Sequence, residues 1–295
     1  MRNERWFPYF LIAPTVILIA VLMLLPIAQV FNLSLRTYSL ANFSEAGKFI
    51  GIQNFEQMFQ DGVFFRSLQV TFKWVFFEIV LQLVIGIIAA LLLNKHFKGK
   101  GAARAVTFVP WAVSGVLTSM LWLLLFDQSI GVINDILKRL LLIRDNVAWL
   151  ANPKLVFPSI IIAELWRGIP FFAITILAAL QSVPADLYEA SDIDGCNKTQ
   201  RFFYIMLPLL MESIVFSTLL RAIWEFNSVD MIFTLTGGGP ARMTMTLPIY
   251  LMQTAIVGGN YGYGSTLAAF TFVFLLGFAM IYLRITKGGS IDEQA

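Results

Sequence analysis

Six long apolar stretches restrict what this chain can fold into. A helix needs about 20 mostly apolar residues to cross the hydrocarbon core of a bilayer. Hydrocarbon leaves free backbone amides unsatisfied, so a crossing segment is a helix or part of a closed barrel, and these runs lack the short alternation of barrel strands. The sequence therefore predicts an all-α integral membrane protein, with about six transmembrane helices in a single domain over 1–295. The predicted spans are Phe10–Leu33, Val70–Leu93, Ala105–Phe126, Phe157–Leu180, Leu209–Phe233 and Ser265–Ile285.

The first stretch has an alternative interpretation. Arg2 and Arg5 precede it, as basic residues precede the apolar core of a signal peptide. The run from Phe10 to Leu33 is longer than such a core, and no small-residue cleavage site ends it cleanly. We therefore expect an uncleaved first span.

Composition excludes several functional classes. Only 13% of the residues are charged, whereas soluble domains average about 25%. The basic residues are scattered among apolar runs, which argues against a nucleic-acid partner. One cysteine, Cys196, and one histidine, His96, provide neither a disulfide framework nor a typical metal site. A nucleophile motif and the Walker sequence are also missing, so we expect no enzyme activity, no metal and no cofactor in this chain.

The distribution of basic residues predicts the orientation. A very short loop between the second and third spans carries four cations, a density typical of the cytoplasmic side. An even number of spans then places both termini and the loop 182–208 inside the cell, and the loops 34–69, 127–156 and 234–264 outside. The four cations are Lys95, Lys98, Lys100 and Arg104.

The inside loop 182–208 has the pattern of two helices joined by a sharp elbow. Pro184 suits the first turn of a helix, and Gly195 suits the left-handed position that ends one. Asn197 and Gln200 have the spacing of a capping box for a second helix, and Pro208 closes the segment before the fifth span. The first helix carries apolar side chains that a soluble partner could cover in a groove.

The same loop carries a resemblance to a known family. Glu189-Ala190-Ser191, then Gly195 after three residues, then Ile205-x-Leu207-Pro208 after nine more, resembles the EAA loop of ABC importer permeases. Ser191 departs from the usual alanine. The alternative is an ordinary amphipathic helix lying on lipid. The resemblance implies a type I ABC importer permease fold with a cytoplasmic coupling helix that docks on the ATPase through Leu187, Tyr188, Glu189, Ala190, Ser191, Asp194 and Gly195.

The resemblance extends over the chain to Ile285 and is closest to the maltose-type, or carbohydrate-uptake, subfamily. The segments 126–134 and 235–240 also resemble that subfamily. The resemblance implies a second homologous permease subunit, two copies of an ABC ATPase that bind ATP and Mg²⁺, and an extracellular or periplasmic sugar-binding protein. It also implies a multi-pass protein of the bacterial inner, or cytoplasmic, membrane, surrounded by the lipid bilayer.

Polar residues inside the spans are candidates for a solute pathway, because such residues are costly in lipid and usually face a cavity or a partner. Arg221 and Glu225 lie four apart and could instead pair with each other. The resemblance implies sugar contacts from the third, fourth and fifth spans. These candidates are Trp111, Gly115, Glu164, Arg167, Gly168, Phe171, Trp224, Glu225, Asn227 and Ser228.

These observations predict the permease subunit of an ATP-driven importer for a sugar. The resemblance to the subfamily implies a disaccharide or an oligosaccharide as that sugar. A glycerol-phosphate importer is the alternative that Arg167 leaves open, while the acids Glu164, Glu225 and Asp230 favour hydroxyl groups. An ion-coupled secondary transporter is a further alternative; it would be favoured by internal repeats, which the sequence lacks.

Overall fold

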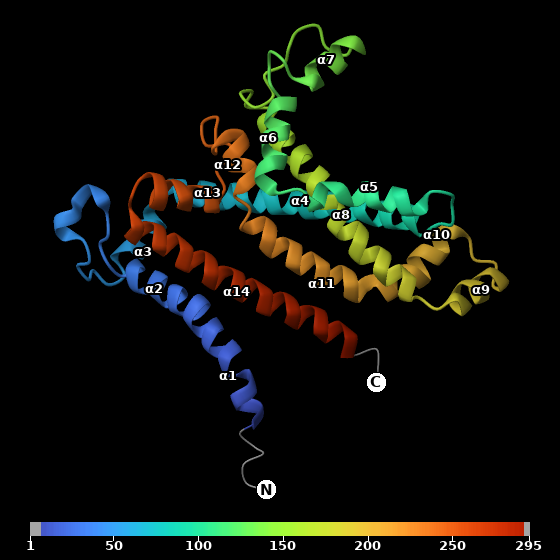
Figure 1. The fold of residues 1–295 in the computed structure, drawn as a ribbon, viewed down its shortest axis with the longest axis horizontal. Helices are drawn as coiled ribbons and strands as arrows, with labels where there is room; N and C mark the ends of the chain where they lie inside the picture. Colours follow the sequence, from blue (N-terminus) through green and yellow to red (C-terminus); the bar gives the residue numbers. More distant parts are fainter. Residues whose placement is uncertain (1–6, 292–295) are drawn as a thin grey trace. The chain divides into compact units, whose positions relative to one another are not determined.

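The computed structural model describes residues 7–291, and the regular elements within that range are helices (Figure 1). Five helices are long and apolar enough to cross a membrane, or six if one bent pair counts as a single span. This confirms the predicted helical membrane protein. Arg2, Arg5 and both chain ends lie outside the described residues.

The described chain divides into two compact units. The first comprises Met1–Arg66 and Tyr250–Phe278. Asn54 ties its segments together, because its side-chain amide donates to the carbonyls of Ser34 and Arg36 at 2.9 and 3.1 Å. The helices of this unit are α1 (Phe7–Ile19), η1 (Ala20–Leu24), α2 (Leu25–Ser34), η2 (Leu40–Glu45), α3 (Gln53–Gln60), the start of α4 (Gly62–Asn94), η4 (Gln253–Val257) and most of α14 (Tyr261–Ile291).

The second unit comprises Ser67–Ile249 and Ala279–Ala295 and carries the candidate site. Its core joins α4, α8 and α11 through apolar side chains such as Leu93, Phe172 and Leu210. Its helices are the rest of α4, α5 (Lys100–Ala112), α6 (Gly115–Leu125), α7 (Val132–Arg139), α8 (Val156–Ser182), α9 (Ala185–Ile193), α10 (Lys198–Arg201), η3 (Phe202–Met206), α11 (Leu207–Phe226), α12 (Asp230–Thr236) and the start of α13 (Leu247–Met252).

Close packing of α4 on α8 depends on a missing side chain. A Cβ added at Gly86 would lie 2.5 Å from Cβ of Phe172, so only glycine permits this approach. Ala90, one turn further along α4, is fully buried in the same core. Small residues let membrane helices approach closely. The small residues Gly86 and Ala90 therefore serve close packing inside this chain.

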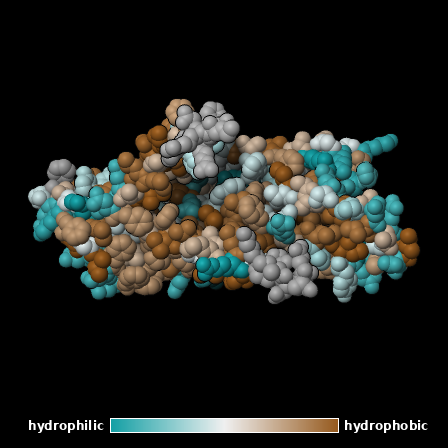
Figure 2. Space-filling view, turned by 90° about the horizontal axis from the view of Figure 1, so that it is seen from below, coloured by the Kyte–Doolittle hydropathy of each residue, from teal (hydrophilic) through white to brown (hydrophobic). Residues whose placement is uncertain are grey.

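Many large apolar side chains remain exposed to the surroundings. Leu11, Leu22 and Ile281 are examples, and Figure 2 shows hydrophobic residues over much of the visible face. An exposed apolar surface of this extent is typical of lipid contact or of a subunit interface. It agrees with the low charge content of the sequence.

The third predicted span is broken, which corrects the expectation of one continuous helix over Ala105–Phe126. α5 ends at Ala112 and α6 begins at Gly115, and the two are bent by 95°. Val113 and Ser114, which lie between the two helices, each have an extended backbone with ψ of 138°. An α-helix of 11 residues is about 16 Å long, too short to cross a hydrocarbon core of about 30 Å alone.

The fifth predicted span also differs from the expectation. α11 ends at Phe226, and α12 begins as a separate helix at Asp230. At its other end, α11 is continuous with the inside loop: α10 runs through the π-helical turn η3 into α11, past Pro208. A π turn widens the backbone just where the prolyl ring lacks a donor and would clash with the preceding turn. The sequence suggested that Pro208 closes the inside loop before the fifth span. In the structure the helix instead continues through Pro208.

Candidate functional site

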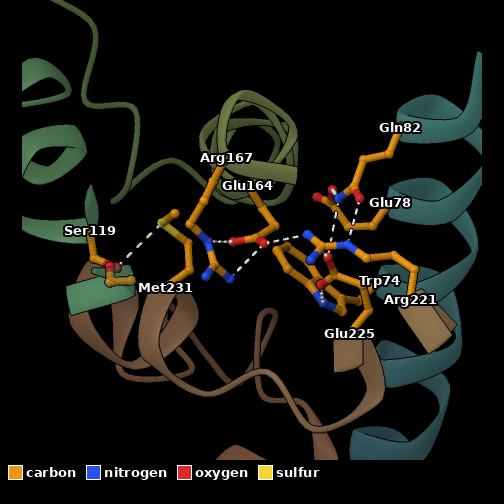
Figure 3. A network of polar contacts seen from close by, with 10 residues as sticks. Trp74, Glu78, Gln82, Ser119, Glu164, Arg167, Arg221, Glu225 and Met231 are labelled. Carbon is orange, nitrogen blue, oxygen red and sulfur yellow. Dashed lines mark hydrogen bonds and ion pairs between the residues drawn. The ribbon is translucent and has the colours of Figure 1, made fainter. Parts of the chain in front are cut away.

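Five polar side chains from α4, α8 and α11 meet inside the second unit (Figure 3). Nη2 of Arg221 lies 2.9 Å from Oε1 of Glu164 and 2.6 Å from Oε1 of Glu225. Its Nε donates to Oε1 of Gln82 at 2.7 Å. Arg167 donates to both carboxylate oxygens of Glu164, from Nε at 3.1 Å and from Nη2 at 2.7 Å. The guanidinium of Arg221 on α11 thus contacts both α4 and α8.

The edge of this network is formed by α4. Gln82 donates to Oε2 of Glu78 at 2.7 Å and to Oε1 of Glu225 at 3.1 Å, and the indole of Trp74 donates to Oε2 of Glu225 at 3.1 Å. Trp74, Glu78 and Gln82 are spaced four residues apart, so they share one face of α4. Trp74 and Gln82 were not predicted from the sequence, although this repeat of polar or indole-bearing residues within an apolar span was a usable signal.

The centre of the network is closed to its surroundings. Glu164 is 0% exposed, Glu225 2% and Arg221 4%. Buried charges are tolerated when they are paired and hydrogen-bonded, and here each of these groups has a partner of opposite charge. The predicted pairing of Arg221 with Glu225 is confirmed.

Gly168 provides the space that the network occupies. A Cβ at this position would lie 2.4 Å from Nη2 of Arg221 and 2.4 Å from the side-chain amide of Gln82. Real Cβ contacts are not that short, because the van der Waals repulsion is steep. Glycine at 168 therefore admits the guanidinium and the amide to the surface of α8.

A second glycine stands at the break between α5 and α6. A Cβ at Gly115 would lie 2.7 Å from Oδ2 of Asp230 and 3.4 Å from Nη1 of Arg167. Ser119, one turn further along α6, is 3.5 Å from the sulfur of Met231 on α12 (Figure 3). The broken span thus places the free end of the Arg167 guanidinium beside the first residue of α12.

The aromatic side chains predicted to contact the sugar lie mostly outside the buried polar network. The rings of Phe171 and Trp224 lie 5.2 Å apart, and Trp224 is 46% exposed while Phe171 is buried. Trp111 is exposed near the end of α5. Asn227 is exposed, and its side-chain amide donates to the carbonyl of Ile223 in its own helix. Within residues 7–291, no side-chain hydrogen bond or ion pair joins Trp111, Asn227 or Ser228 to the buried network, although the backbone amide of Ser228 donates to the carbonyl of Glu225 at 3.2 Å.

The inside loop has the local structure that the sequence predicts. Pro184 precedes α9 as its N-cap, and Gly195 has φ +71°, in the left-handed region. Asn197 and Gln200 form the capping box, each accepting from the other's backbone amide at 2.9 Å. Asp192 of α9 forms an ion pair with Arg201 of α10 across the elbow.

The predicted coupling residues divide into two groups. Tyr188 packs against the apolar core of its own chain, and Ser191 is buried and donates to the carbonyl of Tyr188 at 2.7 Å. Tyr188 therefore fastens α9 to the core, while Ser191 is buried and bonds within α9. Leu187, Glu189, Ala190 and Asp194 are exposed, as is Ile193, so a partner would meet these side chains.

A multi-span helical protein with an exposed helix–elbow–helix at the end of a span is typical of a membrane permease. The profile of the family described as "Binding-protein-dependent transport system inner membrane component" matches residues 82–287. The chain belongs to this family.

Individual relatives cover almost the whole chain. It is 35% identical over 285 residues to the trehalose/maltose transport system permease protein of Thermococcus litoralis, covering 97% of this chain and 95% of the relative. It is 34% identical over 285 residues to the sulfoquinovosyl glycerol transport system permease protein of Agrobacterium fabrum, covering 97% and 92%.

A solved structure shows the same fold. A chain of a bacterial ABC transporter that imports the acidic polysaccharide alginate matches with a TM-score of 0.82 at 23% identity, covering 97% of this chain and 96% of that one. The fold is therefore that of an ABC importer permease, as expected.

Proposed function

We propose that this chain is a transmembrane permease subunit of an ATP-driven importer that takes up a sugar delivered by an extracellular binding protein. One observation carries the proposal: in a member of this permease family, α9 is fastened to the core through Tyr188, while Leu187, Glu189 and Ile193 are exposed. A helix held rigidly from behind and exposed in front can transmit a partner's movement, because only differential contacts shift an equilibrium.

The partners of the proposed importer are a second homologous permease, two ABC ATPase subunits and the binding protein. The ATPases bind ATP and Mg²⁺, and this chain needs no cofactor of its own. Both termini and α9 lie on the cytoplasmic side. Support comes from two relatives, which are named as permeases for trehalose or maltose and for sulfoquinovosyl glycerol.

The sugar contacts of the proposed pathway are the exposed side chains near the buried network. Trp224, backed by Phe171, and Trp111 offer aromatic faces, and Asn227 and Ser228 lie where α11 gives way to α12. Aromatic faces with a few polar groups are typical of sites for small polar ligands. Arg167 is the partly exposed edge of the network and lies beside the break at Gly115.

The test is uptake by the reconstituted importer. Proteoliposomes containing both permeases and the ATPase, supplied with the binding protein outside and ATP inside, should accumulate sugar from a panel of neutral disaccharides and oligosaccharides, glycerol phosphate and anionic glycosides. Omitting ATP, the ATPase or the binding protein should abolish uptake. Uptake that follows an ion gradient without ATP would overturn the proposal in favour of a secondary transporter.

A further inference from the structure

We propose that Glu164, Gly168 and Glu225 do not contact the sugar, and that they form with Arg221 and Gln82 a closed clamp between α4, α8 and α11. Arg221 is then a positioning residue: through Glu164 it sets the place of Arg167 at the edge of the pathway. The inference rests on the proposed function for the identity of that pathway. It reassigns three positions that the family resemblance places at the sugar site.

The first argument is that both carboxylates are buried and that each already has three polar contacts within the protein. Oε1 of Glu164 accepts from Arg221 and from Arg167, and its Oε2 accepts from Arg167. Oε1 of Glu225 accepts from Gln82 and pairs with Arg221, and its Oε2 accepts from Trp74. With side-chain exposures of 0% and 1%, neither carboxylate presents a lone pair to a sugar hydroxyl.

The second argument comes from Gly168 and is independent of the ion pairs. A glycine at a sugar site would leave room beside the pathway. Here the missing Cβ would overlap Nη2 of Arg221 and the amide of Gln82, each 2.4 Å away. The space that a side chain at position 168 would fill is therefore taken by Gln82 of α4 and Arg221 of α11.

Arg167 is the charged member that reaches the edge. Its side chain is 24% exposed, against 5% for Arg221. Glu164 holds it by two parallel hydrogen bonds, a bidentate geometry that fixes both distance and plane. Its remaining Nη1 lies on the side of Gly115 and Asp230. Without Arg221, Glu164 would be paired with Arg167 alone. The two side chains could then move together, and the position of Arg167 would no longer be fixed.

The experiment uses the complete importer in proteoliposomes and compares Arg221→Met with the triple variant Glu164→Gln/Arg221→Met/Glu225→Gln. Arg221→Met should reduce uptake per assembled complex more than tenfold, because it leaves the buried Glu225 without a counter-charge and removes one of the two cations that pair with Glu164. The triple variant removes the charges of Glu164 and Glu225, and it keeps an amide oxygen at position 164 that can still accept a hydrogen bond from Arg167. It should restore assembly and uptake to within about threefold of the wild type, with an unchanged KM for the sugar-loaded binding protein.

The outcomes separate a clamp from a sugar site. Wild-type behaviour of Arg221→Met would overturn the clamp. A triple variant that assembles but stays more than tenfold impaired, or that changes sugar preference, would show that Glu164 or Glu225 contacts the sugar. If the triple variant does not assemble, the double variant Glu164→Gln/Glu225→Gln, which retains Arg221, is measured in the same way. The proposal requires that its KM and its sugar preference match those of the wild type.

Gly168→Ala tests the same clamp without altering any polar group. It should reduce assembly and uptake, whereas Gly277→Ala, whose added Cβ meets nothing within 4 Å, should behave as wild type. Equal behaviour of the two alanine variants would contradict the clamp. If the wild-type importer moves none of the sugars, the proposed function fails. The clamp is then still decided by the Tm of the purified complexes, which Arg221→Met should lower and the triple variant restore.

Discussion

At the scale of single residues, Trp111 and Asn227 are the plainest candidates for sugar contact, because both are exposed and neither belongs to the buried network. An aromatic contact contributes about 0.5–1.5 kcal/mol. Trp111→Ala should therefore reduce uptake about three- to tenfold with unchanged assembly, and Asn227→Ala should have a similar effect. Phe76→Ala, which removes an exposed aromatic from α4, is the matched control. Unchanged uptake in both test variants would remove these residues from the site.

Asp61 forms a second polar junction, within the first unit. Its Oδ2 accepts from the hydroxyl groups of Tyr250 and Tyr263 at 2.5 and 2.7 Å, and its Oδ1 accepts from the backbone amide of Val63 at 2.8 Å. Burial works against ionisation, but these hydrogen bonds and one from the amide of Phe64 outweigh it. The pKa of Asp61 therefore lies below its ordinary value.

The lowered pKa of Asp61 gives a pH-dependent prediction. A depressed carboxyl pKa stabilises the folded state above the unfolded-state pKa, and that contribution is lost as the pH falls through the folded-state pKa. Asp61→Asn should lower stability at pH 7 by about 1 kcal/mol, measured as the Tm of the purified complex. The difference from the wild type should disappear once the pH is below the folded-state pKa. A difference that persists unchanged in acid would show that the charge of Asp61 is not its cause.

At the scale of elements, the elbow after α9 depends on one backbone angle. Gly195 has φ +71°, and a Cβ there would meet nothing within 4 Å, so the restriction is conformational rather than steric crowding. Gly195→Val should abolish stimulation of the ATPase by the loaded binding protein, because a β-branched residue disfavours positive φ. Gly195→Asn should retain most of it, since asparagine tolerates the left-handed region. Equal ATPase stimulation in the two variants would contradict this role of the elbow.

Glu189 tests the docking face of α9 separately from the elbow. Its side chain is exposed, so Glu189→Lys should leave the fold intact while reversing the charge that meets the ATPase. We expect ATPase to be released, or its stimulation lost, in pull-down and activity measurements on the same preparation. Asp186→Lys, a charge reversal at another exposed position of α9, is the control. Full coupling in Glu189→Lys would exclude an ionic contact there.

At the scale of the whole molecule, we expect the chain to be stable only within a complex. Long α-helices such as α4 and α14 leave apolar side chains uncovered, including Phe76, Val80 and Met280. Lipid covers some of this surface, and a second permease should cover more. Co-expression with the second permease and the ATPase should raise the Tm and the yield of monodisperse protein, measured by size-exclusion chromatography. Sugar transport by the chain reconstituted alone would contradict this expectation.

The spans and the inside loop could be predicted from the sequence because local rules decide them. A run of about 20 apolar residues in lipid forms a helix, because a helix satisfies the backbone hydrogen bonds within the segment itself. The elbow at Gly195 and the capping box of Asn197 and Gln200 depend on residues close in the chain. The break at 113–114 was missed because both arms, α5 and α6, are apolar, and hydropathy counts composition rather than direction.

The candidate site could be predicted only as a set of residue types. Its sequence shows charges in the second, fourth and fifth spans, and the spacing of Arg221 and Glu225 indicates one pair. Which residue of α4 or α8 meets that pair depends on how each helix is rotated and how closely it packs. Gly168 admits Arg221 to the surface of α8, and Gln82 reaches it from α4. Only tertiary packing therefore decided that Glu164 faces Arg221, because ion pairing acts across space between residues that the chain separates by 57 positions.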